Sequence, residues 1–121
     1  MNYFTDKELR CKCGCNENKF SLLTLARLND LRQEYGKPII LSSAYRCHEY
    51  NEKKGYTQTH ATGQAVDILT SRKEAYIILS LAFKYGFTGI GIKQHGNNRF
   101  IHIDDLLQTE TRKRPVIWGY V

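Results

Sequence analysis

Apolar residues recur with helical spacing in two stretches of the chain. Between residues 21 and 35, and again between residues 71 and 85, apolar side chains return every three or four positions. A serine stands at the start of each stretch, where its side chain caps a helix, and each stretch is followed by a helix-ending glycine, Gly36 or Gly86. The pattern therefore predicts two helices that each pack one face on a core.

Strand-like patterns occur in four short segments. The first is a continuous apolar run, the second alternates, and the last two flank a polar connection rich in glycine and asparagine, which is typical of a hairpin. These segments are residues 38–44, 64–69, 88–93 and 99–104. Residues 45–55 are polar and predicted to be irregular or briefly helical, and residues 56–63 are predicted to form a loop. Together with the two helices, these segments predict an α+β fold.

The strand period of two places polar side chains together on one face of two segments. His102 and Asp104 share a face, and Asp67 lies opposite the apolar residues that flank it. An unpaired carboxylate on a packed sheet is costly, and a metal ion would neutralise it. Two imidazoles and a carboxylate are a standard ligand set for a catalytic zinc ion, which keeps a fourth position open. With His60 from the preceding loop, the pattern indicates one Zn²⁺ site.

Length and composition agree with one domain. The chain has 121 residues, of which 41% are hydrophobic, so we expect a single domain over residues 1–121. The first residues lack the apolar region of a secretory signal, and no stretch is long and apolar enough to span a membrane. We therefore expect cytoplasmic synthesis without a signal peptide and no membrane insertion. No heptad or long apolar edge predicts an oligomer, so we expect a monomer.

The net charge of +6 favours anionic partners, including nucleic acid and cell-wall polymers. The basic residues are spread along the chain, however, and the densest cluster, at residues 112–114, is short. This distribution favours a solvated basic surface over an element that binds nucleic acid.

The four cysteines leave several alternatives open. Cys11, Cys13 and Cys15 are separated by single residues, a tighter spacing than structural zinc sites usually show, so the sequence gives little support to a four-thiolate metal site. Free thiols in a reducing compartment and a disulfide in an oxidising one are the other two states. An N-terminal thiol packed against Cys47 would tie the N-terminal segment to the core.

Three motifs together resemble a known family. They are Tyr45-Arg46, the HxxGxAxD pattern at residues 60–67, and the HxD pattern at residues 102–104. In combination they look like the zinc D-Ala-D-Ala carboxypeptidase family, which also holds peptidoglycan endopeptidases, and most like its small single-domain branch that includes phage endolysins. The N-terminal Cys-Lys-Cys-Gly-Cys stretch also looks like members of this branch, so the similarity covers almost the whole chain.

The resemblance implies both a fold and a site. The fold would be a small antiparallel sheet flanked by helices, as in hedgehog and the D-Ala-D-Ala peptidases. His60, Asp67 and His102 would bind the zinc ion, and Arg46 would receive a carboxylate or carbonyl of the peptidoglycan peptide stem. Independent chemistry agrees, because nitrogen and oxygen ligands suit Zn²⁺ and a guanidinium matches a carboxylate with two parallel hydrogen bonds.

The general base is the point where the chain departs from the family. Many members carry a carboxylate three residues before the second histidine, and that position is Arg99 here. Asp104 is the expected catalytic substitute, although it could instead orient His102. His95 is a further candidate for proton transfer or for stabilising an oxyanion.

Other polar and aromatic residues have expected places around the site. Tyr45 and Gln58 are expected to hydrogen-bond the substrate. Trp118 is expected in the core rather than in a cleft wall.

Three functions compete at this stage. The first is a zinc peptidase that cuts peptidoglycan, either as a D,D-carboxypeptidase or as an endopeptidase. Such an enzyme would be phage-encoded and would reach the cell wall after its release from the cell. The second is a catalytically silent relative that binds a metal and a wall peptide. The third is a basic nucleic-acid-binding domain with a structural zinc ion on its cysteines, which leaves the histidines and Asp67 without a role.

Overall fold

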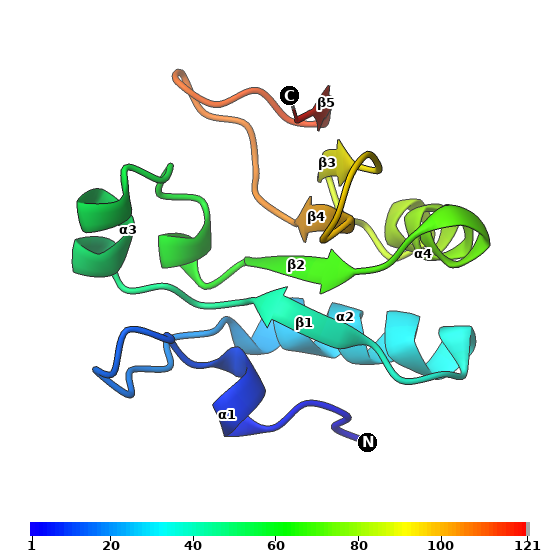
Figure 1. Cartoon of the computed structure of the whole chain (residues 1–121), viewed down its shortest axis with the longest axis horizontal. Helices are drawn as coiled ribbons and strands as arrows, with labels where there is room; N and C mark the ends of the chain where they lie inside the picture. The colour runs from blue at the N-terminus through cyan, green and yellow to red at the C-terminus, as the bar shows by residue number, and fades with distance from the viewer. Residues whose placement is uncertain (121) are drawn as a thin grey trace.

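A mixed sheet with strand order β1-β2-β4-β3-β5 organises the chain (Figure 1). The structure is a computed structural model that describes residues 1–120. Neighbouring strands are antiparallel except for β3 and β5, which are parallel. In chain order, the elements are α1 (Asp6–Leu9), α2 (Leu22–Tyr35), β1 (Ile40–Ser43), α3 (His48–Lys54), the 3₁₀ turn η1 (His60–Thr62), β2 (Ala65–Leu69), α4 (Arg72–Lys84), β3 (Gly89–Lys93), β4 (Phe100–Asp104) and β5 (Val116–Gly119). The α+β fold class predicted from the sequence is confirmed.

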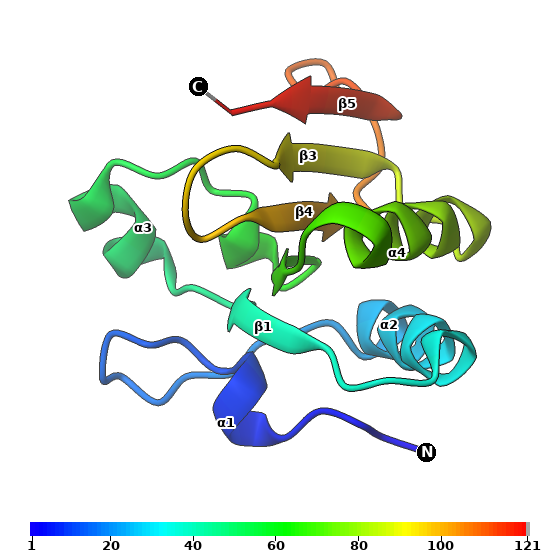
Figure 2. The same cartoon turned by 45° about the vertical axis from the view of Figure 1, so that its right-hand side comes forward.

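Helices α2 and α4 lie side by side on one side of the sheet (Figure 2). Their buried side chains, among them Leu28 and Ile78, form one core with the apolar residues of the central strands. Val66 on β2 and Ile103 on β4 are fully buried in this core. Successive side chains of a strand point to opposite faces of the sheet. Asp67, next to Val66, and His102, next to Ile103, therefore point away from this core.

The helix ends follow the sequence signals in part. The Ser21 hydroxyl accepts a hydrogen bond from the Thr24 N–H at 3.2 Å, and Gly36 ends α2 with a positive φ of 76°. Ser71 also stands at the start of α4, but its side chain makes no capping hydrogen bond within the described residues. The expected serine cap is therefore present only on α2.

Three elements lie where the sequence pattern indicated none. Helix α1 is a single turn with a complete capping box between Thr5 and Glu8. The expected loop at residues 56–63 contains η1, and the C-terminal segment adds β5 beside β3. Residues 45–55 contain the short helix α3, as predicted.

No helix in residues 1–120 is long and apolar enough to cross a membrane.

Candidate metal centre

His60, Asp67 and His102 meet on the sheet face that is turned away from the helices. The Oδ1 atom of Asp67 lies 3.2 Å from Nε2 of His60 and 3.1 Å from Nδ1 of His102. One nitrogen or oxygen from each residue lies within 4.8 Å of the others, and both histidines are 3% exposed. The structure therefore brings together the three residues that the sequence motifs singled out as zinc ligands.

Strand register and one glycine produce this meeting. Asp67 and His102 are direct partners in the antiparallel pairing of β2 and β4, so their side chains are neighbours on one face. His60 reaches the same point from η1, which ends at Gly63 with a positive φ of 74°. A Cβ atom at Gly63 would collide with the backbone carbonyl of Lys19. Only glycine therefore lets the chain turn from η1 into β2 at this place.

The hydrogen bonds of His60 determine which ring nitrogen is free. Its Nδ1 lies 2.7 Å from the Ala44 carbonyl oxygen, which can only accept a hydrogen bond. The Nδ1 atom therefore carries the proton and donates it to this carbonyl. In the neutral ring the Nε2 lone pair then faces the Asp67 carboxylate.

The same reasoning applies to His102. Its Nε2 lies 2.8 Å from Oδ2 of Asp104, a carboxylate that also accepts two hydrogen bonds from Arg114. Nε2 therefore donates to Asp104, and the Nδ1 lone pair faces Asp67. Three electron-rich atoms converge in a buried place, and a cation or extra protons must stabilise them. The nitrogen and oxygen donors fit a zinc ion.

The electrostatics of the cluster follow from these contacts. Burial alone would raise the pKa of Asp67, but its contacts with the His102 and His60 rings hold this pKa far below its usual value. Burial would lower the pKa of His102, and its contacts with Asp104 and Asp67 raise it instead. Without a metal, the cluster therefore favours an ionised carboxylate beside a protonated imidazole.

Asp104 is fully buried and both of its oxygens are engaged. Oδ1 accepts from Nε of Arg114 at 2.8 Å and from the Leu106 N–H at 3.3 Å, and Oδ2 accepts from Nη2 of Arg114 and from His102. Burial raises the pKa of Asp104, but the bonds from His102 and Arg114 bring it down to about 2. A Cβ atom at Gly89 would collide with this carboxylate, so β3 also leaves room for it.

An open cleft of about 960 Å³ contains the three clustered residues and also Arg46, Gln58 and Trp118. The Arg46 guanidinium lies over the Tyr56 ring, 4.6 Å from its centroid. Within residues 1–120, Nε of Arg46 and Oε1 of Gln58 are buried and have no hydrogen-bond partner. Two of the three predicted substrate-binding residues, Arg46 and Gln58, therefore line the cleft, and each has a buried polar atom without a partner among residues 1–120.

Two other predicted site residues lie outside this cleft. Tyr45 is 4% exposed and packs beside Cys11 and Cys47, and its hydroxyl lies 3.3 Å from a Glu17 carboxylate oxygen. Tyr45 and Arg46 are adjacent in the chain, yet Arg46 lines the cleft whereas Tyr45 packs with Cys11 and Cys47. His95 is exposed in the turn between β3 and β4.

Sequence reasoning missed or misplaced two residues of the site. Arg114 pairs with Asp104, and no local pattern indicates this partnership because ten residues separate them. Trp118, which we expected in the core, lines the cleft, with its ring centroid 5.0 Å from that of His102. The register explains this place, because Trp118 pairs with Gly91 and Gly91 pairs with His102. Gly91 has no side chain, and the indole therefore covers it.

A buried cluster of two histidines and an aspartate in an open cleft can hold a catalytic zinc ion, as in metallopeptidases. Comparison with protein families agrees with this class. The Peptidase M15 model matches residues 2–104, and the chain belongs to this family. The family is zinc-dependent, and the matched region includes the whole His60, Asp67 and His102 cluster. A search of curated proteins found no match to the chain.

Proposed function

We propose that the chain is a zinc peptidase that hydrolyses peptide bonds in bacterial peptidoglycan, as an endolysin-type endopeptidase or a D,D-carboxypeptidase. One observation carries this proposal. The His60, Asp67 and His102 cluster opens into a cleft that Arg46 also lines, and Nε of Arg46 has no hydrogen-bond partner among residues 1–120. Membership of the M15 family supports the peptidase activity, and the peptide-stem substrate is our inference.

Nε2 of His60, Oδ1 of Asp67 and Nδ1 of His102 would hold the zinc ion. When bound, the ion supplies Lewis acidity, which polarises the scissile carbonyl and makes water a nucleophile at neutral pH. The Ala44 carbonyl and the Asp104 carboxylate fix the tautomer and orientation of the two imidazoles by accepting from their other nitrogens.

Arg46 is the proposed substrate anchor. Peptidoglycan stems carry free carboxylates, and a guanidinium holds a carboxylate with two parallel hydrogen bonds. Arg112, Lys113 and Arg114 line the same cleft. Arg114 is paired with Asp104, so the positive charge of Arg112 and Lys113 would attract an acidic stem and orient it before it contacts the cluster.

Asp104 has two proposed roles, and its contacts favour one of them. Its oxygens accept from Arg114, His102 and the Leu106 N–H, and it is fully buried. A carboxylate held in this way is suited to orient His102 and is poorly placed to collect a proton from the cleft. We therefore propose Asp104 as a positioning residue.

A silent relative that binds a metal and a wall peptide is the second candidate. One observation favours it: among residues 1–120, Asp67 is the only carboxylate residue that lines the cleft. A general base would then have to come from another type of group. The single-domain organisation, the monomeric state and the action at the wall after release stay predictions.

Mass spectrometry of digested wall material tests the proposal. Zinc-loaded protein is incubated with purified peptidoglycan and soluble muropeptides, and new termini identify the bond that is cut. His60→Ala should abolish product formation, whereas His48→Ala should not, because His48 is exposed and outside the cleft. Full activity of His60→Ala would refute the peptidase site. Zinc and peptide binding without any product would select the silent relative.

A further inference from the structure

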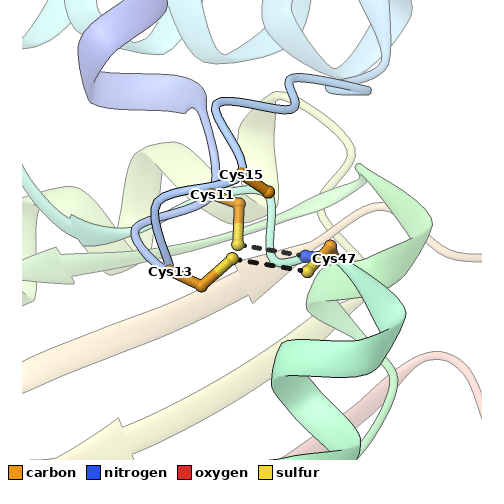
Figure 3. Close-up of side chains that lie close together, drawn as sticks. All are labelled: Cys11, Cys13, Cys15 and Cys47. Atoms are coloured by element: carbon orange, nitrogen blue, oxygen red, sulfur yellow. Dashed lines mark hydrogen bonds between the residues drawn. The ribbon is translucent and has the colours of Figure 1, made fainter.

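The four cysteines converge at one point (Figure 3). Cys11, Cys13 and Cys15 lie in the segment between α1 and α2, and Cys47 lies immediately before α3. Their sulfur atoms all lie within 4.8 Å of one another, and none of them forms a disulfide. Two segments that are far apart in the sequence therefore bring four metal-ligating atoms together.

We propose that Cys11, Cys13, Cys15 and Cys47 bind a second metal ion, a structural zinc held by four thiolates. This site is separate from the His60, Asp67 and His102 cluster and does not depend on the proposed peptidase activity. Zinc binding converts each thiol to a thiolate and releases its proton to the solvent, and no group is oxidised or reduced.

The spacing of the sulfur atoms fits tetrahedral coordination. With Zn–S bonds of about 2.3 Å, the corners of a tetrahedron are about 3.8 Å apart. The Sγ atoms of Cys13 and Cys47 are 3.7 Å apart. A disulfide would require the two sulfurs to approach to about 2.05 Å. The observed separation is too long for a disulfide and matches the spacing of two ligands of one ion.

Backbone N–H groups already point at the sulfurs. The Cys47 N–H donates to Sγ of Cys11 at 3.3 Å, and the Glu17 N–H donates to Sγ of Cys15 at 3.4 Å. Such bonds stabilise the negative charge of a thiolate and orient it toward a metal.

The backbone between the N-terminal cysteines accounts for their unusually tight spacing. Gly14 has a φ of +100° and Asn16 a φ of 60°, so the chain reverses direction around Cys15. A glycine adopts this conformation without strain. The sequence spacing alone argued against a four-thiolate site, and the turn removes that objection.

Charge near the cluster also suits a thiolate site. A divalent ion with four thiolates has a net charge of about −2. Lys19, Lys53 and Lys54 line the cavity beside the cysteines, together with Glu17 and Glu49. The lysines exceed the glutamates, so the surroundings offset part of this negative charge.

The site would fix the segment that supports the cleft. Cys47 directly follows Arg46, and the Ala44 carbonyl in the same segment accepts from His60. The Tyr45 N–H donates to the Leu9 carbonyl, so the N-terminal segment already contacts this stretch. A metal that joins Cys47 to the N-terminal cysteines would hold both Arg46 and His60 in place.

Metal analysis and cobalt substitution test the proposal. We expect anaerobically purified protein with zinc in excess to hold about two ions per chain, and the double variant His60→Ala/His102→Ala to retain about one. When Co²⁺ replaces zinc in this double histidine variant, its absorption spectrum should show the intense bands of tetrahedral thiolate coordination. Cys13→Ser/Cys15→Ser should lose these bands and keep the metal at the histidine cluster.

A thiol-specific mercurial provides a measurement on the unmodified chain, in case the cysteine variants fail to fold. It should release about one zinc ion per chain, with the same yield from the double histidine variant. No zinc release, with all four thiols reacting freely, would overturn the proposal. A mass lower by two hydrogens in protein kept under reducing conditions would overturn it as well, because it would show a disulfide between two of the ligands.

Discussion

Replacing Asp104 with asparagine separates the two roles that are open to this carboxylate. The substitution keeps the size of the side chain and removes the charge that faces His102 and Arg114. If Asp104 orients His102, the affinity for zinc should fall by about 10- to 100-fold, and excess zinc should restore hydrolysis. If Asp104 accepts a proton in the reaction, the zinc affinity should stay the same and kcat should fall by about 10²- to 10⁴-fold. We expect the first result.

The cost to stability follows from the burial of the ion pair. The Asp104 side chain is fully buried and that of Arg114 is 9% exposed. Removing one partner of a buried pair costs about 3–5 kcal/mol, and the remaining asparagine oxygen can still accept a hydrogen bond. We therefore expect a loss of about 3 kcal/mol in the free energy of unfolding, which urea denaturation would measure. A domain with about 5–15 kcal/mol of stability stays folded after this loss.

Asp105→Asn is the matched control. Asp105 is also buried and accepts from Arg27 and Thr24, but it does not contact either histidine of the cluster. This variant should lose stability and keep its zinc affinity, measured by competition with a chromogenic chelator. Asp104→Asn protein that binds zinc as tightly as the parent, yet makes no product at saturating zinc, would refute the positioning role.

Four further outcomes are expected. Gly91→Ala places a Cβ atom 2.7 Å from Nε1 of Trp118. It should lower the free energy of unfolding by about 1–3 kcal/mol and shift the fluorescence of this sole tryptophan. Gly119→Ala is the control and should do neither, because the nearest contact of its Cβ atom is 3.9 Å away. Arg46→Lys should raise KM about tenfold and leave zinc content and kcat nearly unchanged, because it removes the two parallel hydrogen bonds and keeps the charge; a fall in kcat alone would argue against an anchoring role. Leu28→Ala, in the fully buried core, should lower the free energy of unfolding by about 2–5 kcal/mol in urea. A chelator should abolish hydrolysis and added zinc should restore it; activity that survives complete zinc removal would contradict a metal-dependent reaction.

Local patterns were sufficient for the elements that carry strong periodicity. The helices α2 and α4 and the β3–β4 hairpin lie within a few residues of their predicted bounds, because each has a repeating apolar face or a turn sequence. Helix α1 was missed although Thr5 and Glu8 form a readable capping box. Strand β5 was missed because it pairs in parallel with a strand far away in the sequence and is only half-buried.

The site shows the same division between local and distant information. Strand alternation singled out Asp67, His102 and Asp104, the loop before Asp67 supplied His60, and the family motif agreed with this set. Nothing in the sequence near Asp104 indicated that Arg114 would occupy its oxygens, because this contact depends on the path of the chain after β4. The turn at Gly14 likewise decides whether closely spaced cysteines can face one point, and its positive φ is a property of the fold.

The segment of residues 44–47 connects the two clusters, and its alternation explains why neighbouring residues have different roles. Arg46 points into the cleft, whereas Tyr45 and Cys47 pack on the other side with Cys11. The backbone alternates in the same way: the Tyr45 N–H donates to Leu9 and the Arg46 N–H donates to the His60 carbonyl. Because this segment contacts both clusters, a metal on the cysteines would stabilise the backbone that orients the cleft. Each cluster is still expected to bind its own metal, and the effect of the cysteine site on the cleft is the positioning of Arg46 and His60 through this segment.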